Sequence, residues 1–171
     1  MISLKPFTEN DFEQFKSWKL TSRDLAIFAG PIFKLPISDE QLQNYLNRTE
    51  IKPFKVVLDH SSEIIGHCEL NYGHEIPRLS RILIASHSVR GKGIGQEIVS
   101  KLAEMAFKDD SVQMVDLNVF DFNASAIKCY QKVGFLKNEV PTLKHLFREE
   151  TWTRLNMVLT REGFLSRRKQ L

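Results

Sequence analysis

Residues 80–107 read SRILIASHSVRGKGIGQEIVSKLAEMAF, and this stretch decides how the rest of the chain is interpreted. The aliphatic run over residues 81–85 is typical of a buried strand. Residues 90–95, RGKGIG, follow as a basic loop with three glycines. Apolar residues then recur at helical spacing and predict an amphipathic helix: Ile94, Ile98, Val99, Leu102, Ala103, Met105, Ala106 and Phe107.

A glycine loop that ends at a helix N-terminus predicts an anion site, because the first N–H groups of the helix are free and its dipole favours negative charge. Other phosphate loops do not fit. A Walker loop needs four residues between its glycines and then Lys and Ser or Thr, and a dinucleotide loop needs a glycine where Gln96 stands. A protein-kinase loop belongs with further motifs that this sequence lacks. From the residues alone, a tight connection without a ligand stays open.

Arg90, Gly93 and Gly95 match the acyl-coenzyme A loop of the GNAT acetyltransferase superfamily, Arg/Gln-x-x-Gly-x-Gly/Ala. Residues 118–135, NVFDFNASAIKCYQKVGF, resemble the second motif of that family. The resemblance implies an N-acetyltransferase that moves an acetyl group directly from acetyl-CoA to a primary amine, on a protein N-terminus, polyamine, aminoglycoside or other small molecule. It also implies a single-domain α/β (α+β) fold, with a mixed, mostly antiparallel sheet that splays at the coenzyme site and helices on both faces.

The resemblance assigns the coenzyme contacts to these two motifs. The loop would hold the diphosphate, mainly through backbone N–H groups, and Ile84 and Ala85 would bind pantetheine and the thioester carbonyl. Asn123 would contact the coenzyme, although it is also a good helix N-cap. The complete set of expected coenzyme-binding residues is Ile84, Ala85, Val89, Arg90, Gly91, Lys92, Gly93, Ile94, Gly95, Gln96, Asn123, Ala126 and Lys132. For Lys132, a solvated surface lysine is the alternative.

Two residues are expected to be catalytic. By resemblance, Tyr130 is the general acid, since a phenol with a pKa of about 10 can protonate a thiolate whose thiol has a pKa of about 8.5. The alternative is that Tyr130 only fills the core face of its helix. Glu69 is the expected general base, on a strand face shared with His67 and Asn71. That face could equally be a polar strand face at the solvent edge. The other candidates for the general base are His67, His74, Glu75 and Arg81.

Composition predicts one soluble domain over residues 1–171, with 42% hydrophobic and 26% charged residues. No apolar run is long enough for a membrane helix, and residues 1–6 lack a signal-peptide pattern. With only Cys68 and Cys129, no disulfide framework is expected. A cytoplasmic protein without a membrane partner is the simplest interpretation.

The net charge of +3 lies in residues 161–171, so no nucleic-acid partner is expected. This basic segment is interpreted as a partly disordered tail. The five histidines show no ligand spacing, so no metal site is expected. The sequence does not distinguish a monomer from a homodimer.

Along the chain, strands are expected over residues 2–7, 54–58, 63–72, 81–85, 113–120, 135–140 and 151–159. Helices are expected over residues 9–20, from Ser38, over residues 94–107 and over residues 123–134. Residues 22–36 and 141–150 are interpreted as irregular connections.

Two other functions remain as hypotheses. A coenzyme A-binding sensor would keep the loop but not need Tyr130. An unrelated nucleotide-binding domain would bind ATP or NAD, which the loop spacing disfavours.

Overall fold

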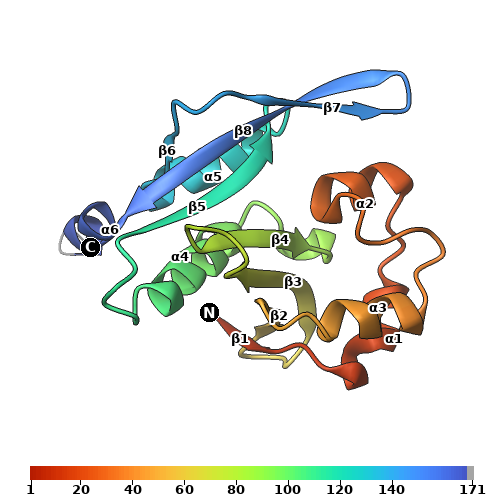
Figure 1. The fold of residues 1–171 in the computed structure, drawn as a ribbon. Helices are drawn as coiled ribbons and strands as arrows, with labels where there is room; N and C mark the ends of the chain where they lie inside the picture. The colour runs from red at the N-terminus through yellow and green to blue at the C-terminus, as the bar shows by residue number, and fades with distance from the viewer. Residues whose placement is uncertain (169–171) are drawn as a thin grey trace.

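The computed structural model describes residues 1–168 and contains an eight-stranded sheet in the order β1-β2-β3-β4-β5-β8-β6, with β7 paired to β8 (Figure 1). The strands are β1 (Ile2–Pro6), β2 (Ile51–Leu58), β3 (Ile64–Asn71), β4 (Arg78–Ile84), β5 (Met114–Phe120), β6 (Leu136–Lys137), β7 (Leu143–Phe147) and β8 (Glu150–Thr160). The helices are α1 (Phe12–Ser17), α2 (Ser22–Ala29), α3 (Asp39–Leu46), α4 (Ile94–Ala106), α5 (Ala124–Val133) and α6 (Arg161–Arg168), with short 3-10 turns η1 (Glu9–Asp11) and η2 (His87–Val89).

The sheet is antiparallel except between β4 and β5, and there it splays. These two strands pair in parallel only at Arg78 with Asp116 and at Leu79 with Leu117. Beyond Leu79 they diverge, and Figure 1 shows β5, β8 and α5 as a separate arm above β4 and α4. The expected mixed sheet with a splay beside the loop is therefore confirmed.

Helices cover both faces of the sheet, as expected. The larger core lies under α4 and α5, where Ile98, Leu102 and Ala103 pack against sheet residues such as Val56 and Leu117. The second core lies under α1, α2 and α3 and is rich in aromatic residues: Phe7, Phe12, Phe15, Phe28, Phe33 and Tyr45. The two cores hold the strands that carry the candidate site.

Residues 22–36 contain a helix that the sequence analysis missed. The Thr21 side chain accepts a hydrogen bond from the Asp24 backbone N–H, and the Asp24 carboxylate accepts from the Thr21 backbone N–H, so α2 begins with a capping box. Leu25 and Phe28 bury its inner face. Gly30-Pro31, which suggested a loop, instead follows the helix, with Gly30 as its C-cap.

Three further boundaries differ from expectation. The helix expected over residues 9–20 is η1 followed by α1, and it ends at Ser17. The strand expected over residues 135–140 is only β6, while the connection expected over residues 141–150 contains β7. β7 and β8 form a hairpin, with Phe147 paired to Glu150.

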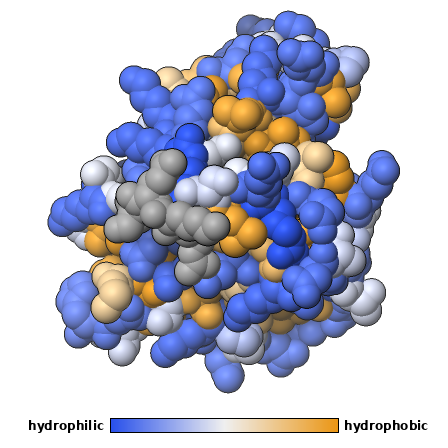
Figure 2. Space-filling model, turned by 90° about the vertical axis from the view of Figure 1, so that its left-hand side faces the viewer, coloured by the Kyte–Doolittle hydropathy of each residue, from blue (hydrophilic) through white to orange (hydrophobic). Residues whose placement is uncertain are grey.

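The segment expected to be a partly disordered basic tail is a helix over Arg161–Arg168. Phe164 is buried against Phe107, and Arg161 donates from Nε to the Val112 carbonyl at 2.9 Å. Arg167 donates to the Lys132 carbonyl at the end of α5. These contacts correct the expectation for residues 161–168, and residues 169–171 lie outside the described part. Figure 2 shows the face around the C-terminus, which is mainly hydrophilic with smaller apolar patches.

Across residues 1–168, no helix is both long and apolar enough to span a membrane.

Candidate active site

The basic glycine loop connects β4 to α4 and is anchored by apolar side chains at its two ends. Val89 and Ile94 are buried in the larger core, whereas residues 90–93 are exposed. Gly91 and Gly93 have φ angles of +78° and +82°, a conformation that costs glycine little and other residues more. The loop therefore has a fixed shape with its exposed part pointing outward.

Gly95 differs from these two glycines, since it lies at a close contact between helices. A Cβ atom at Gly95 would lie 3.1 Å from the Cys129 Sγ of α5. The first turn of α4 and the middle of α5 therefore approach each other closely at this point. Burial raises the pKa of the Cys129 thiol, so it stays protonated and is a packing group rather than a nucleophile.

The N-terminus of α4 has no side-chain cap, since its N-cap is Gly93. The acidic residue of the first turn, Glu97, accepts a hydrogen bond from the Ile2 N–H at 2.9 Å and so faces β1. The first N–H groups of α4 thus have no side-chain acceptor in the described chain, which suits an anion. Gln96 lies half-buried in this turn, and Lys92 is exposed in the loop before it.

Arg90 ties the loop to the end of β4. Its Nε and Nη2 atoms donate to the Ile84 carbonyl at 3.1 and 2.8 Å. The structure therefore gives Arg90 a backbone contact in place of the secondary anion contact expected from the sequence. This contact lies on the side of β4 that faces the splay.

At the end of β4, the backbone N–H groups of Ile84 and Ala85 point to opposite sides of the strand. The Ala85 N–H donates to the Ile65 carbonyl of β3 at 2.8 Å, so it is used within the sheet. Because N–H groups alternate along a strand, the Ile84 N–H points the other way, toward the splay. Of the two expected residues, Ile84 is therefore the one whose N–H is directed into the splay.

Helix α5 carries the expected second motif on the other arm of the splay. Asn123 is its N-cap and accepts from the Ala126 N–H at 3.3 Å, while Gly134 ends it with a φ of +115°. Tyr130 packs against the larger core, and its hydroxyl has no hydrogen-bond partner among residues 1–168. Burial raises the pKa of Tyr130, so its proton is present at neutral pH. Lys132 is exposed near the end of the helix.

Glu69 is completely buried in β3, in contrast to the open strand face expected from the sequence. Tyr45 of α3 donates its hydroxyl hydrogen to one carboxylate oxygen, and Arg81 of β4 donates to the other. Burial, together with the negative charge of Glu69, raises the pKa of Tyr45 well above its usual value, so Tyr45 remains a donor. Both oxygens of Glu69 are thus engaged inside the protein.

Arg81 lies at a β-bulge that precedes the splayed end of β4. The register with β3 shifts between His67 and Glu69, and Arg81 has a φ of +47°, which is uncommon for a residue with a side chain. The His67 Nδ1 lies 3.2 Å from the Arg81 carbonyl, and Glu69 holds the guanidinium. Sequence analysis treated these residues as competing bases and did not predict that they hold one another.

The comparisons with known proteins identify this arrangement. The sequence model of the acetyltransferase (GNAT) domain family matches residues 2–136. The chain belongs to the GNAT acetyltransferases. This acetyltransferase is 28% identical over 149 residues to an aminoglycoside N(6')-acetyltransferase type 1 of Klebsiella pneumoniae, covering 78% of this chain and 73% of that protein. It is 38% identical to a kanamycin resistance protein of Rhizobium radiobacter, over 30% of this chain and 48% of that protein.

Solved structures show the same fold. An aminoglycoside acetyltransferase in complex with coenzyme A and kanamycin matches with a TM-score of 0.75 and 25% identity, covering 98% of this chain and 99% of the other. Spermidine N-acetyltransferase from Vibrio cholerae, in complex with coenzyme A and spermine, matches with a TM-score of 0.78 and 16% identity, covering 96% and 98%.

The acetyltransferase is therefore an enzyme that transfers an acetyl group from acetyl-CoA to an amine, as the sequence predicted. Among its described residues, no group of three or more His, Cys, Asp or Glu side chains could hold a metal ion.

Proposed function

We propose that this acetyltransferase acetylates a primary amine of a cationic small molecule, with Tyr130 as the general acid. The observation that carries the proposal is the Tyr130 hydroxyl, which has no hydrogen-bond partner among residues 1–168 and lies on α5, the helix that packs against α4. The aminoglycoside and spermidine acetyltransferases among its relatives support an acceptor of this class.

In the proposed reaction, the neutral amine nitrogen attacks the thioester carbonyl carbon. The Ile84 N–H stabilises the negative charge that develops on the carbonyl oxygen. As the C–N bond forms and the C–S bond breaks, Tyr130 donates its proton to the departing thiolate. The nitrogen releases its extra proton to water, which leaves the neutral amide, and the tyrosinate regains a proton from solvent. Lys92 and the first N–H groups of α4 bind the diphosphate, Arg90 holds the loop against the Ile84 carbonyl, and Asn123 contacts the coenzyme.

We assign Glu69 to positioning rather than to proton abstraction. Both of its oxygens are already bonded to Tyr45 and Arg81, which leaves neither oriented toward an acceptor. The ammonium of the acceptor loses its proton to water before attack, or the amine arrives neutral. We expect the enzyme to be cytoplasmic and either monomeric or homodimeric.

A spectrophotometric assay of the free thiol of coenzyme A tests the proposal. Acetyl-CoA is incubated with the enzyme and with polyamines, aminoglycosides, amino acids or peptides as acceptors. We expect acceptor-dependent thiol release, strongest with polyamines or aminoglycosides. Thermal stabilisation by acetyl-CoA without thiol release from any acceptor would favour the alternative, a non-catalytic coenzyme A-binding protein.

A further inference from the structure

A cage for a positive charge lies where β5, β7 and β8 meet, and the side chain of Arg23 occupies it. The Arg23 Nη1 donates to both carboxylate oxygens of Glu150, at 2.7 and 2.8 Å. The guanidinium carbon lies 4.9 Å from the ring centroid of Trp152 and 5.4 Å from that of Phe122. One carboxylate and two aromatic faces thus surround one cation, a combination that binds ammonium and guanidinium groups.

The walls of the cage are held in place without help from Arg23. Trp152 is buried, and its indole N–H donates to Glu150 at 2.8 Å. Phe147 stacks on Trp152 with ring centroids 4.4 Å apart, and Phe120 stacks on Phe122 at 5.5 Å. The cage therefore belongs to the C-terminal arm of the sheet and does not require the contact from α2.

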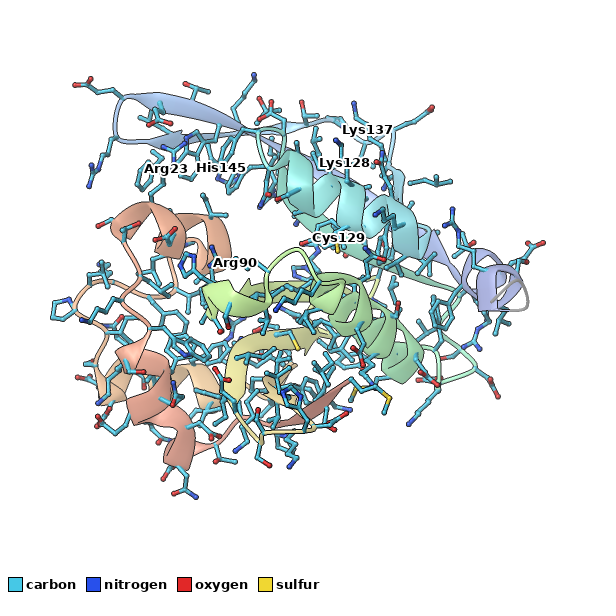
Figure 3. All side chains as sticks on the ribbon, turned by 180° about the vertical axis from the view of Figure 1, so that it is seen from behind. Arg23, Arg90, Lys128, Cys129, Lys137 and His145 are labelled. Atoms are coloured by element: carbon cyan, nitrogen blue, oxygen red, sulfur yellow. The ribbon has the colours of Figure 1, made fainter. Side chains whose placement is uncertain are left out.

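Arg23 itself is held only loosely. The side chains of Arg23 and Glu150 are 46% and 54% exposed, and ion pairs of this exposure contribute little to stability. Arg23 reaches the cage from α2, which packs against β4 on the other side of the splay. Figure 3 shows Arg23 beside His145 of β7, with Arg90 of the coenzyme loop on the facing segment. A competing cation can displace Arg23 at small cost.

The cage lies at the edge of the sheet where the acetyl group would be. β4 and β5 run parallel, so their C-terminal ends, Ile84 and Phe120, are at the same edge. Phe122 follows β5 directly. Helix α2 packs against β4, whose end leads into the coenzyme loop, and Arg23 of α2 contacts Glu150 and Trp152 of the cage. Helix α2 therefore connects the β4 side of the splay with the cage.

We propose that Glu150, Trp152 and Phe122 form a subsite for a second cationic group of the acceptor, an ammonium or guanidinium that displaces Arg23 while the primary amine reacts. This inference rests on the proposed function and identifies the residues that favour an acceptor with two positive charges. If Arg23 instead serves only to hold α2 against β8, then its loss affects all acceptors alike.

Kinetics with unbranched diamines of increasing length, each compared with the monoamine of equal length, test the subsite. For the wild-type enzyme we expect kcat/KM to favour a diamine that spans the distance by about 10-fold, as one cage interaction would provide. Arg23→Ala removes the competitor, so KM for that diamine should fall while the monoamine is unaffected. Glu150→Gln and Trp152→Leu should remove the preference. Arg48→Ala, which breaks an ion pair with Glu50 elsewhere, is the matched control.

A binding experiment separates this inference from the proposed function. In the Arg23→Ala variant on a Trp18→Phe background, the remaining indole N–H resonance belongs to Trp152. Ethylguanidinium should shift that resonance in Arg23→Ala, and should not shift it when Glu150→Gln is added. A shift with no acetylation of any amine would remove the proposed function but keep the cage. No shift, or equal kinetic effects of Arg23→Ala on diamines and monoamines, would overturn the subsite.

Discussion

The guanidinium of Arg81 and the carboxylate of Glu69 form an ion pair that is enclosed between β3, β4 and α3. Glu69 has no exposed surface, and the Arg81 side chain is 13% exposed. Arg81 is also the residue with φ of +47° at the bulge before Ile84. The pair therefore fixes the part of β4 from which the Ile84 N–H points into the splay.

Glu69→Ala should destabilise the protein by about 3–5 kcal/mol, because it leaves a buried, unpaired guanidinium. Chemical denaturation measures the loss. Arg81→Met combined with Glu69→Leu should recover most of it, since a buried pair can be replaced by apolar residues of similar volume. Glu50→Ala, at a half-exposed ion pair with Arg48, should change stability little. An equally small effect of Glu69→Ala would contradict the enclosed pair.

Glu69→Gln separates positioning from base catalysis. The amide oxygen can still accept a hydrogen bond, so part of the geometry is kept while the carboxylate is lost. With a positioning role, kcat should fall by less than about 10-fold; loss of a general base typically costs 100-fold or more. Steady-state kinetics over a range of pH makes the measurement. A 100-fold loss of kcat with unchanged stability would return Glu69 to the role expected from the sequence.

Tyr130→Phe should lower kcat by about 100-fold, because the general acid is lost while the ring is kept. KM for acetyl-CoA and the melting temperature should stay near wild type, as the hydroxyl has no partner among residues 1–168. Tyr72→Phe, at an exposed tyrosine beside Lys52, serves as the control. An unchanged kcat in Tyr130→Phe would exclude Tyr130 as the acid.

Gly95→Ala should weaken acetyl-CoA binding by forcing α4 away from α5, since the new Cβ would lie 3.1 Å from the Cys129 Sγ. Adding Cys129→Ala removes that sulfur and should restore binding. Gly93→Ala should also weaken binding, by strain at a φ of +82°, and Cys129→Ala should not rescue it. Calorimetric titration with acetyl-CoA measures all four variants. Rescue of both glycine variants, or of neither, would refute the packing explanation for Gly95.

The stability of the protein should fall as the pH drops from about 6.5 to about 4, in part because of His67. Burial lowers the pKa of His67 to about 4 from a reference value of 6.5. In this window the unfolded chain binds a proton at His67 and the folded protein does not, so the unfolded state is favoured by up to about 3 kcal/mol. Above pH 6.5 both states are neutral at this site, and no contribution remains.

Denaturant titrations at several pH values test this dependence. His67→Gln should show a shallower loss of stability below pH 6.5 than the wild type. His60→Gln, at an exposed histidine in the turn before β3, should follow the wild-type slope. Parallel curves for the wild type and His67→Gln would show that His67 does not titrate as described.

Local signals predicted the fold where they were strong. The loop around Gly93 and the N-cap at Asn123 predicted α4 and α5, because glycine conformation and capping act within a few residues. The splay was predicted from the family resemblance. The start of α2 was available from Thr21 and Asp24, which form a capping box, but Gly30-Pro31 suggested a loop. The strand β7 was not predictable in the same way, since its pairing with β8 fixes it more than its own sequence does.

The candidate site was likewise predicted only in part from the sequence. The two family motifs predicted the coenzyme contacts, since each motif lies within one continuous segment, and those contacts stay a prediction. It could not indicate that the Ala85 N–H is used by Ile65, or that Glu69 is enclosed by Tyr45 and Arg81. Those contacts join residues distant in sequence. The Arg23 cage, which joins α2 to β8, was invisible for the same reason.

The central claim is that acetyl-CoA bound at the α4 loop gives its acetyl group to a primary amine with Tyr130 as the acid. Mass spectrometry of the acceptor after incubation with isotopically labelled acetyl-CoA tests it most directly. The account predicts a labelled N-acetyl amine whose rate of formation falls about 100-fold in Tyr130→Phe. Tight binding of acetyl-CoA with no labelled amine product would contradict it.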